Sequence, residues 1–461
     1  MSAFCPHSCH DIDVSYGPVR YARNGDVRLA YRIFGESGPV VVWTPGWVVG
    51  NVDTVDEASG PYAPLFERVS REIRFVMWDR RGTGLSDPAK DLLSLDERVA
   101  DLQAVLDAIG EERPSLVGTA EGGPVSILYT AMNPDRVRSL ALYGTAARFS
   151  QDLPDFPWGF TSAEIAAQLN DIDNHWGEGA LIELFHGAAA ESPGVRELFG
   201  RHQRAMMSPS MAQLWWRATM EVDVRAVLSM VRAPTLVLAR RGDKVVPIES
   251  SAALAAAIPD AQFHELPQGG HNGWDIIHQL AEELLRFVTD KPDVPADERL
   301  LKTMMFTDIV GSTEQLTATG DAHWRHQLDT HDNVVDCLLK KYGGQQAKHT
   351  GDGVFALFDG PTKAARCALE MVPALATRGI RIRVGIHIGE CERRGEEWSG
   401  MAVHKGARIG SLAAAGEVLS SRTVRDLSAG SDLRFDSLGM RQLKGLPEET
   451  EIFRVSTSTS G

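Results

Sequence analysis

Two aspartates in the last third of the chain have the setting of ligands for divalent cations. Asp308 comes just after the apolar residues Met304–Phe306, and Asp352 lies between two glycines in the turn of an expected hairpin. Carboxylates at the ends of adjacent strands can share divalent cations, and paired cations favour in-line attack at phosphorus. Either aspartate alone is more simply a turn residue, because Asp-Gly is a common hairpin signal. Together they predict chemistry at a phosphate group.

The segments around both aspartates resemble the class III nucleotide cyclases. Phe306–Thr313 is similar to the first metal motif of that family, and Lys348–Asp352 is similar to the second. Gly385–Glu390 and Gly400–Gly410 are similar to two later motifs. The resemblance covers residues 300 to 455 and implies an α+β domain with a ferredoxin-like core.

The resemblance also implies an activity and roles for individual residues. The expected reaction converts ATP to cyclic AMP and pyrophosphate with two Mg²⁺ or Mn²⁺ ions per site. Asp308, Ile309 and Asp352 would belong to the metal site. Lys348 would contact N1 of adenine, and Arg408 would stabilise negative charge on the phosphate.

Two positions depart from the family pattern, and both are expected to tune activity without abolishing it. Glu397 replaces an aspartate that accepts a hydrogen bond from the adenine amino group, and His404 replaces an asparagine near the ribose. In the family, metal carboxylates and base-reading groups come from opposite protomers. Because this chain carries both sets, the resemblance implies a homodimer with two sites.

A second set of residues fits acyl transfer with one member missing. Gly118–Gly123 resembles the strand-to-helix turn on which α/β-hydrolases carry a nucleophilic serine, but its central residue is Ala120. Asp243 and His271 follow later strands in the chain order that this fold requires. By the resemblance, His271 would act as general base and Asp243 would orient it.

Ala120 leaves two explanations open. The backbone N–H groups of Trp47 and Glu121 would still form an oxyanion hole, but a methyl group cannot attack a carbonyl. The alanine is either a deliberate replacement of serine, made to trap a ligand in an otherwise active pocket, or a natural residue in a pocket that binds without turnover. The intact Asp243 and His271 favour the first explanation.

The elements that would position these residues alternate between Val27 and Val288. Short apolar runs alternate with helical-period segments such as Leu95–Gly110, which predicts a mostly parallel, doubly wound α/β sheet. The alternation stops between about 149 and 223, where a helical stretch rich in tryptophan, methionine and phenylalanine predicts a lid. The expected strands are Val40–Gly46, Arg74–Gly82, Pro114–Thr119, Val137–Gly144 and Pro234–Gly242.

The sequence therefore predicts two domains joined by a short linker. Residues 1–290 are expected to form an α/β-hydrolase-like domain, and residues 300–461 are expected to form the cyclase domain. The polar, proline-containing segment 291–299 would connect them. Fusions of these two kinds of domain are a bacterial architecture that the chain resembles along nearly its full length.

Composition and charge narrow the function further. A formal net charge of −15 over 461 residues leaves no basic stripe for nucleic acid. The sequence has no secretory signal and no apolar run long enough to span a bilayer, so a cytoplasmic protein without membrane contact is expected.

Three functions are compatible with these features. The preferred one is an adenylyl cyclase whose N-terminal domain is a regulator or a second enzyme. The second is a carboxylic-ester or lactone hydrolase in which the cyclase domain mainly dimerises. The third is a sensor whose silent hydrolase-like pocket binds a small apolar ligand.

Overall fold

The computed structural model describes residues 17–47, 49–55, 60–289, 299–312, 321–349, 353–394, 397–446 and 448–457. Asp352 lies outside the described residues, as do the side chains of Lys348 and Glu397. The expected linker also lies outside them, except for Arg299, which opens a strand.

The first sheet has eight strands in the order β1-β2-β4-β3-β5-β6-β7-β8. The six strands in the series β4-β3-β5-β6-β7-β8 run parallel to their neighbours, whereas β2 pairs antiparallel with both β1 and β4. The central strands are nearly continuous apolar runs, as expected of parallel strands covered on both faces. The strands are β1 (Arg20–Asn24), β2 (Val27–Phe34), β3 (Val40–Thr44), β4 (Arg74–Trp78), β5 (Ser115–Thr119), β6 (Leu140–Tyr143), β7 (Thr235–Arg240) and β8 (Gln262–Leu266).

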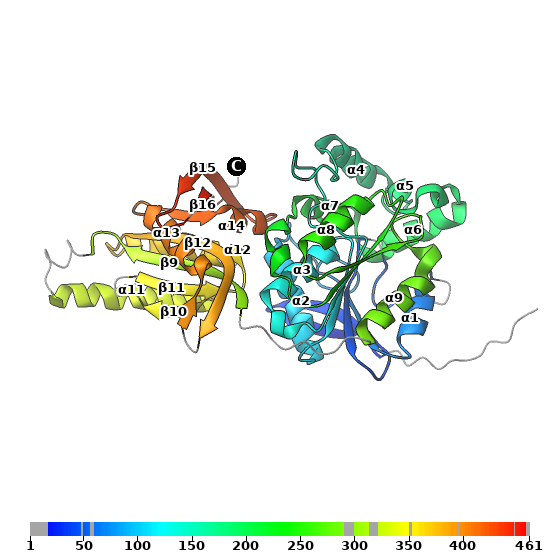
Figure 1. Cartoon of the computed structure of the whole chain (residues 1–461), viewed down its shortest axis with the longest axis horizontal. Helices are drawn as coiled ribbons and strands as arrows, with labels where there is room; N and C mark the ends of the chain where they lie inside the picture. Colours follow the sequence, from blue (N-terminus) through cyan, green and yellow to red (C-terminus); the bar gives the residue numbers. More distant parts are fainter. Residues whose placement is uncertain are drawn as a thin grey trace, which may run out of the picture.

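Helices cover both faces of this sheet, because successive side chains of a strand point to opposite sides. Val42 of β3 shares a core with α2, α3 and α8, whereas Val41 shares a core with α1 and α9. In Figure 1, α2 and α3 lie on the side of the sheet that faces the C-terminal domain. The helices are α1 (Ala63–Val69), α2 (Leu95–Ile109), α3 (Gly122–Met132), α8 (Ile248–Ala257) and α9 (Ile277–Thr289).

A helical insertion lies between β6 and β7, as the sequence predicts. Its residues Phe185 and Trp216 form one cluster with Trp47, Val245 and Val246, which belong to loops after β3 and β7. The insertion therefore covers the carboxyl edge of the parallel strands. Its helices are α4 (Ser162–His175), α5 (Ile182–His186), α6 (Pro193–Met206) and α7 (Pro209–Glu221).

The second sheet contains a ferredoxin-like core. The chain runs β9-α11-β10-β11-α12-β12, and these strands lie in the order β10-β11-β9-β12, followed by β14, β16 and β15. A short strand, β13, pairs with β12. The strands are β9 (Arg299–Ile309), β10 (Gln345–His349), β11 (Gly353–Phe358), β12 (Ile382–Arg394), β13 (Glu397–Ser399), β14 (Val418–Ser421), β15 (Leu433–Gln442) and β16 (Glu449–Thr457).

Helices lie on opposite faces of this second sheet. Met305 and Ile309 of β9 pack with α11, α12 and α14, whereas Met304 packs with α13. A Cβ on Gly406 of α13 would contact the Phe306 ring, so α13 crosses the face to which Met304 and Phe306 belong. The helices are α11 (Asp321–Tyr342), α12 (Pro361–Ala376), α13 (Met401–Leu412) and α14 (Arg422–Leu427).

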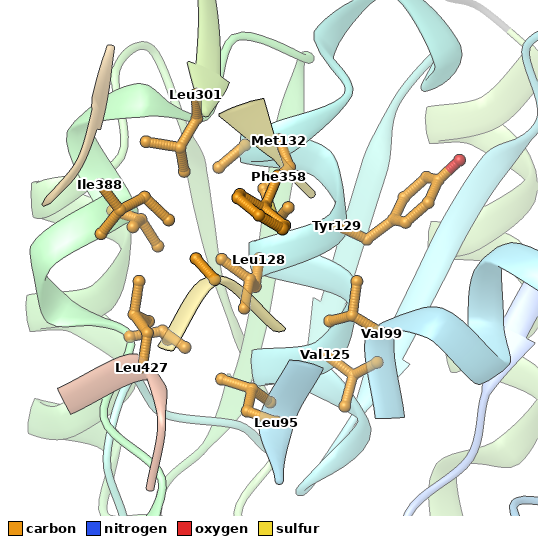
Figure 2. Close-up of a cluster of buried hydrophobic side chains, with 14 of the residues drawn as sticks. Leu95, Val99, Val125, Leu128, Tyr129, Met132, Leu301, Phe358, Ile388 and Leu427 are labelled. Carbon is orange, nitrogen blue, oxygen red and sulfur yellow. The ribbon is translucent and has the colours of Figure 1, made fainter. Parts of the chain in front are cut away.

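The two domains share one hydrophobic core. A single cluster of buried side chains extends from α2 and α3 into β9, β11, β12 and α14 (Figure 2). Figure 2 shows side chains from α2 and α3 beside side chains from the C-terminal domain. The labelled residues are Leu95, Val99, Val125, Leu128, Tyr129 and Met132 on one side, and Leu301, Phe358, Ile388 and Leu427 on the other.

Polar contacts accompany this shared core. The backbone N–H of Thr362, at the start of α12, donates to Asp96 Oδ2 on α2 at 2.8 Å. Arg232 also pairs with Glu390 across the interface at 2.6 Å. Among the described helices, none is both long enough and apolar enough to cross a lipid bilayer.

Candidate functional site

The turn between β5 and α3 keeps the geometry of a nucleophile elbow although its central residue is alanine. Ala120 has a φ of +45°, in the left-handed region that non-glycine residues seldom adopt. Its N–H donates to the Tyr143 carbonyl at 3.2 Å, and its carbonyl accepts from the Thr145 hydroxyl at 2.5 Å. A Cβ on Gly122 would overlap the Thr44 carbonyl, so the start of α3 requires glycine there. These contacts fix Ala120 at the carboxyl end of β5.

Asp243 and His271, which follow β7 and β8, form a buried hydrogen-bonded pair. His271 Nδ1 lies 2.7 Å from Asp243 Oδ2, and the two side chains are 5% and 2% exposed. Asp243 Oδ1 accepts from the N–H groups of Val245 and Val246 at 2.8 and 2.9 Å. Because Asp243 engages Nδ1, the other ring nitrogen of His271 points away from this carboxylate. His271 and Ala120 line the same cavity.

Both residues expected to supply oxyanion-hole N–H groups lie at this edge. Trp47 is buried and lines the cavity, while Glu121 directly precedes α3. The Glu121 carboxylate accepts from Arg80 Nη1 at 2.5 Å, with both side chains almost fully buried. Arg80 Nη2 also donates to the Gly46 carbonyl at 3.2 Å, and its guanidinium lies 4.3 Å from the Trp215 ring centroid. Arg80 thus connects the elbow, the loop after β3 and helix α7.

The cavity over Ala120 has an apolar body and one polar end. It encloses about 790 Å³, part of it open to solvent. Polar groups come from Thr119 and His271, as well as from Tyr62, Tyr143 and Asn272, whereas strands and the helices α1 and α9 contribute apolar side chains. These apolar residues include Trp43, Leu65, Phe75, Val117, Ile277 and Leu284.

In the second domain, Asp308 stands near the end of β9 between two strands. It is in register with Gly353 of β11, the residue after Asp352, and with Arg383 of β12. Arg383 Nε and Nη2 donate to Asp308 Oδ2 at 2.8 and 2.5 Å. The Asp308 side chain is 38% exposed. Ile309, the next residue, is buried.

The residues expected to contact the nucleotide occupy other elements. His404 and Arg408 lie about one turn apart on α13, and both are exposed. Lys348 is on β10 in register with Phe355, and Glu397 opens β13. Among the described side chains, Asp308 forms an ion pair with Arg383 and with neither His404 nor Arg408.

The donor chemistry at Asp308 fits a divalent cation. Its carboxylate is accessible and already binds a cationic guanidinium. Within the described residues, no group of three or more histidines, cysteines, aspartates or glutamates is arranged to hold a metal. Asp352, the expected second carboxylate, lies outside them.

Sequence reasoning missed Arg80 and Arg383. Arg80 stands in the run Asp79–Gly82, where two adjacent arginines gave no sign of which one is buried. Arg383 lies in β12, where apolar residues alternate with polar ones from Ile380 to Gly389, and this period-two spacing gives the face on which its side chain lies. The strand order needed to place it beside Asp308 is a tertiary property.

Comparison with family models finds one match in each half of the chain. A model described as the alpha/beta hydrolase fold matches residues 49–275. A model described as the adenylate and guanylate cyclase catalytic domain matches residues 297–457.

Curated relatives match the N-terminal part. A 2-hydroxymuconate semialdehyde hydrolase from Pseudomonas putida is 32% identical over 243 residues, which are 50% of this chain and 80% of the relative. A pimeloyl-[acyl-carrier protein] methyl ester esterase from Chromobacterium violaceum is 28% identical over 260 residues, 54% of this chain and 94% of the relative.

Solved structures show the same fold for this part. An esterase from Exiguobacterium antarcticum matches with a TM-score of 0.52 and 23% identity, covering 59% of this chain and all of the esterase. A bromoperoxidase from Bacillus anthracis matches with a TM-score of 0.51 and 22% identity, covering 59% of this chain and all of the bromoperoxidase chain.

Proposed function

Because the chain belongs to the α/β-hydrolase-fold family and continues into an adenylate and guanylate cyclase catalytic domain, we propose that it is an adenylyl cyclase. It converts ATP to cyclic AMP: the ribose 3′-oxygen attacks the α-phosphorus, and pyrophosphate leaves. The observation that carries this proposal is the accessible carboxylate of Asp308, in register with the residue after Asp352.

Two Mg²⁺ or Mn²⁺ ions belong to this proposal, held by Asp308, Ile309 and Asp352. When bound, they activate the 3′-hydroxyl and neutralise charge on the triphosphate. The accessibility of the Asp308 carboxylate supports this assignment, and both Arg383 donors engage the same oxygen, Oδ2. Arg383 keeps that carboxylate oriented along the edge of β9.

The remaining side chains bind and orient ATP. Arg408 stabilises the charge that grows on the phosphate, and His404 hydrogen-bonds the ribose. Lys348 and Glu397 read the adenine ring at N1 and at the amino group, which favours ATP over GTP. Exposure of His404 and Arg408 supports a site completed by another copy of the chain.

The active form in this proposal is a homodimer in the cytoplasm, where ATP is available. One protomer supplies Asp308 and Asp352, and its partner supplies the base-reading side chains and Arg408. This division agrees with a structure in which Asp308 contacts neither His404 nor Arg408 within one chain.

Incubation of the purified full chain with ATP and Mn²⁺ tests the proposal. Cyclic AMP should form, and Asp308→Ala should lower its rate by at least about a hundredfold. Asp436→Asn is the matched control, because Asp436 is an accessible aspartate on β15 away from β9. Absence of any cyclic nucleotide from ATP or GTP contradicts the proposal.

A second candidate function rests on the buried pair of His271 and Asp243. With a serine at position 120, this pair could support carboxylic-ester or lactone hydrolysis. The Ala120→Ser variant should then hydrolyse short acyl esters, and its His271→Ala derivative should not. If Ala120→Ser gives no hydrolysis above the parent chain, the hydrolase function is wrong.

A further inference from the structure

The polar end of the cavity over Ala120 is built to hold one negatively charged oxygen. In acyl transfer, this arrangement stabilises an oxyanion while the histidine carries the transferred proton. His271 remains hydrogen-bonded to Asp243, and α3 begins two residues after Ala120, which lines this end of the cavity. Trp47, which lines the cavity, has a buried indole N–H without a partner among the described residues.

Ala120 removes the usual source of that charged oxygen. Without a hydroxyl at position 120, no covalent step can turn a bound carbonyl into an oxyanion. Only a ligand that brings its own anionic oxygen can therefore use the full set of groups. A carboxylate meets this condition, whereas an ester, a lactone or an alcohol does not.

The lining of the rest of the cavity determines which non-polar part such a ligand can have. Val117 of β5 and Leu65 of α1 line it, and Ile277, Leu280 and Leu284 line it from one face of α9. No charged side chain is among the residues that line this part. An unbranched hydrocarbon chain suits this lining.

We propose that this cavity is a receptor site for an apolar monocarboxylate, and that α3 conveys its occupation to the C-terminal domain. The carboxylate lies against His271 and the start of α3, and the hydrocarbon chain lies along α9. The second part rests on the proposed cyclase function, whereas binding itself does not.

Helix α3 connects the cavity with the strand that carries Asp308. It starts directly after the elbow and is buried along its whole length. Its residues Val125, Leu128 and Met132 belong to the cluster that contains Leu301 of β9 (Figure 2). Asp308 lies on the same strand, about 23 Å further along. A displacement of α3 would therefore be passed through packed side chains to β9, the strand that carries Asp308.

Binding of the carboxylate is coupled to uptake of a proton. A ligand carboxylate beside the buried Asp243–His271 pair would place a second negative charge next to Asp243, so we expect one proton to enter with the ligand and to lie between it and His271. Burial lowers the pKa of His186 to about 4, so this neighbour stays neutral. Among the described residues, the titratable groups near His271 include Asp243, Tyr143 and His186, and the Arg240–Asp275 ion pair adjoins Gly270, the residue before it.

Isothermal titration calorimetry of the full chain with octanoate tests the site. At pH 8, in buffers of different ionisation enthalpy, we expect saturable binding with uptake of about one proton. 1-Octanol, with the same chain and a neutral head group, should bind at least about tenfold more weakly and without proton uptake. Equal affinity for the two probes overturns the proposal. So does failure of every even-numbered acid from butanoate to dodecanoate to bind saturably.

Two pairs of variants test the two ends of the site. His271→Phe should lower octanoate affinity at least about tenfold and abolish proton uptake, whereas His278→Phe, exposed on α9, should change neither. Leu280→Trp should fill the tail region and abolish binding, whereas Gln279→Trp, on the exposed face of the same helix, should not. Unchanged binding in both His271→Phe and Leu280→Trp places octanoate elsewhere and overturns the site.

The rate of cyclic AMP formation tests the connection through α3. Saturating octanoate should change this rate at least about twofold in the parent chain and leave it unchanged in Leu280→Trp. Binding without any change in rate overturns the connection but not the site. If no cyclic nucleotide forms at all, the proposed cyclase function fails, and calorimetry still decides the site.

Discussion

At the scale of single residues, buried charge is the feature that most shapes the N-terminal site. Arg80 and Glu121 are almost fully buried and form an ion pair, although the neighbouring Arg81 looks equivalent in the sequence. Burial of two charges is costly unless both are paired and hydrogen-bonded. Arg80 meets this condition with Glu121 and the Gly46 carbonyl, and stacking on Trp215 adds to it.

Loss of one partner of this pair should therefore be more damaging than loss of both. Arg80→Met should lower the free energy of unfolding by about 3–5 kcal/mol, because it leaves the Glu121 carboxylate buried and unpaired. The double variant Arg80→Met, Glu121→Gln should recover most of that loss. Urea unfolding followed by tryptophan fluorescence measures both.

An exposed pair provides the control for this experiment. Arg241 and Glu265 form an ion pair with side chains that are 61% and 44% exposed. Arg241→Met should change the free energy of unfolding by less than about 1 kcal/mol. Equal effects of Arg80→Met and Arg241→Met would show that burial of the first pair has no energetic consequence.

At the scale of elements, regular helices and strands followed from local signals. The prediction for Leu95–Gly110 is met by α2, which begins after a Ser94–Glu97 capping box and ends at Gly110 with φ +75°. The five predicted buried strands correspond to β3 to β7. Local periodicity and caps suffice for such elements, because the spacing of apolar residues along the chain shows which side chains face the core and the caps mark where a helix begins and ends.

The position of α3 between the first sheet and the C-terminal domain could not be predicted from the elbow motif, although the lack of charged residues in α3 indicated burial on all sides. Every residue of α3 is buried, and Val125–Met132 has no charged face. A helix that is apolar on all sides must pack against something on each of them. The sheet covers one side of α3, and the C-terminal domain covers another. Which element supplies that second surface depends on tertiary packing.

A charge on α3 should separate the two domains. Leu128→Glu would bury a carboxylate in the shared core of Figure 2, where no cationic side chain is among the labelled residues. We expect the radius of gyration from X-ray scattering to increase and thermal unfolding to split into two transitions. Ala108→Glu, exposed on α2, should change neither. A compact Leu128→Glu protein with a single transition would contradict the role of α3.

At the scale of the whole molecule, the sequence predicted two domains and a polar linker but not the interface between them. Thr362 donates its backbone N–H to Asp96, so a carboxylate of the first domain caps a helix of the second. These residues are far apart in the chain. In the sequence, Asp96 looks like any acidic residue in the first turn of a helix, so its contact with α12 could not be predicted. Sequence motifs identified the candidate site residues. Which of them lie beside one another depends on the tertiary fold, which the motifs do not give.

The interface should make stability depend on pH through Asp96. Burial raises the pKa of this carboxyl from 3.8 to about 7, against the opposing effect of the Thr362 N–H. A carboxyl with a raised pKa in the folded protein favours the protonated form, so the free energy of unfolding falls as pH rises from about 4 to about 7. Asp96→Asn should lose less stability than the parent between pH 5 and pH 8. Thermal unfolding at both values checks this, and equal losses would contradict it.

Mixing two inactive variants tests the central claim, a cyclase site shared between two copies of the chain. Asp308→Ala and Arg408→Ala damage complementary halves of each site, so a mixed dimer retains one intact site of two. Since random exchange makes half of the dimers mixed, we predict recovery of about a quarter of the parent rate of cyclic AMP formation. Each variant alone should stay inactive. No recovery after verified subunit exchange would contradict the shared site.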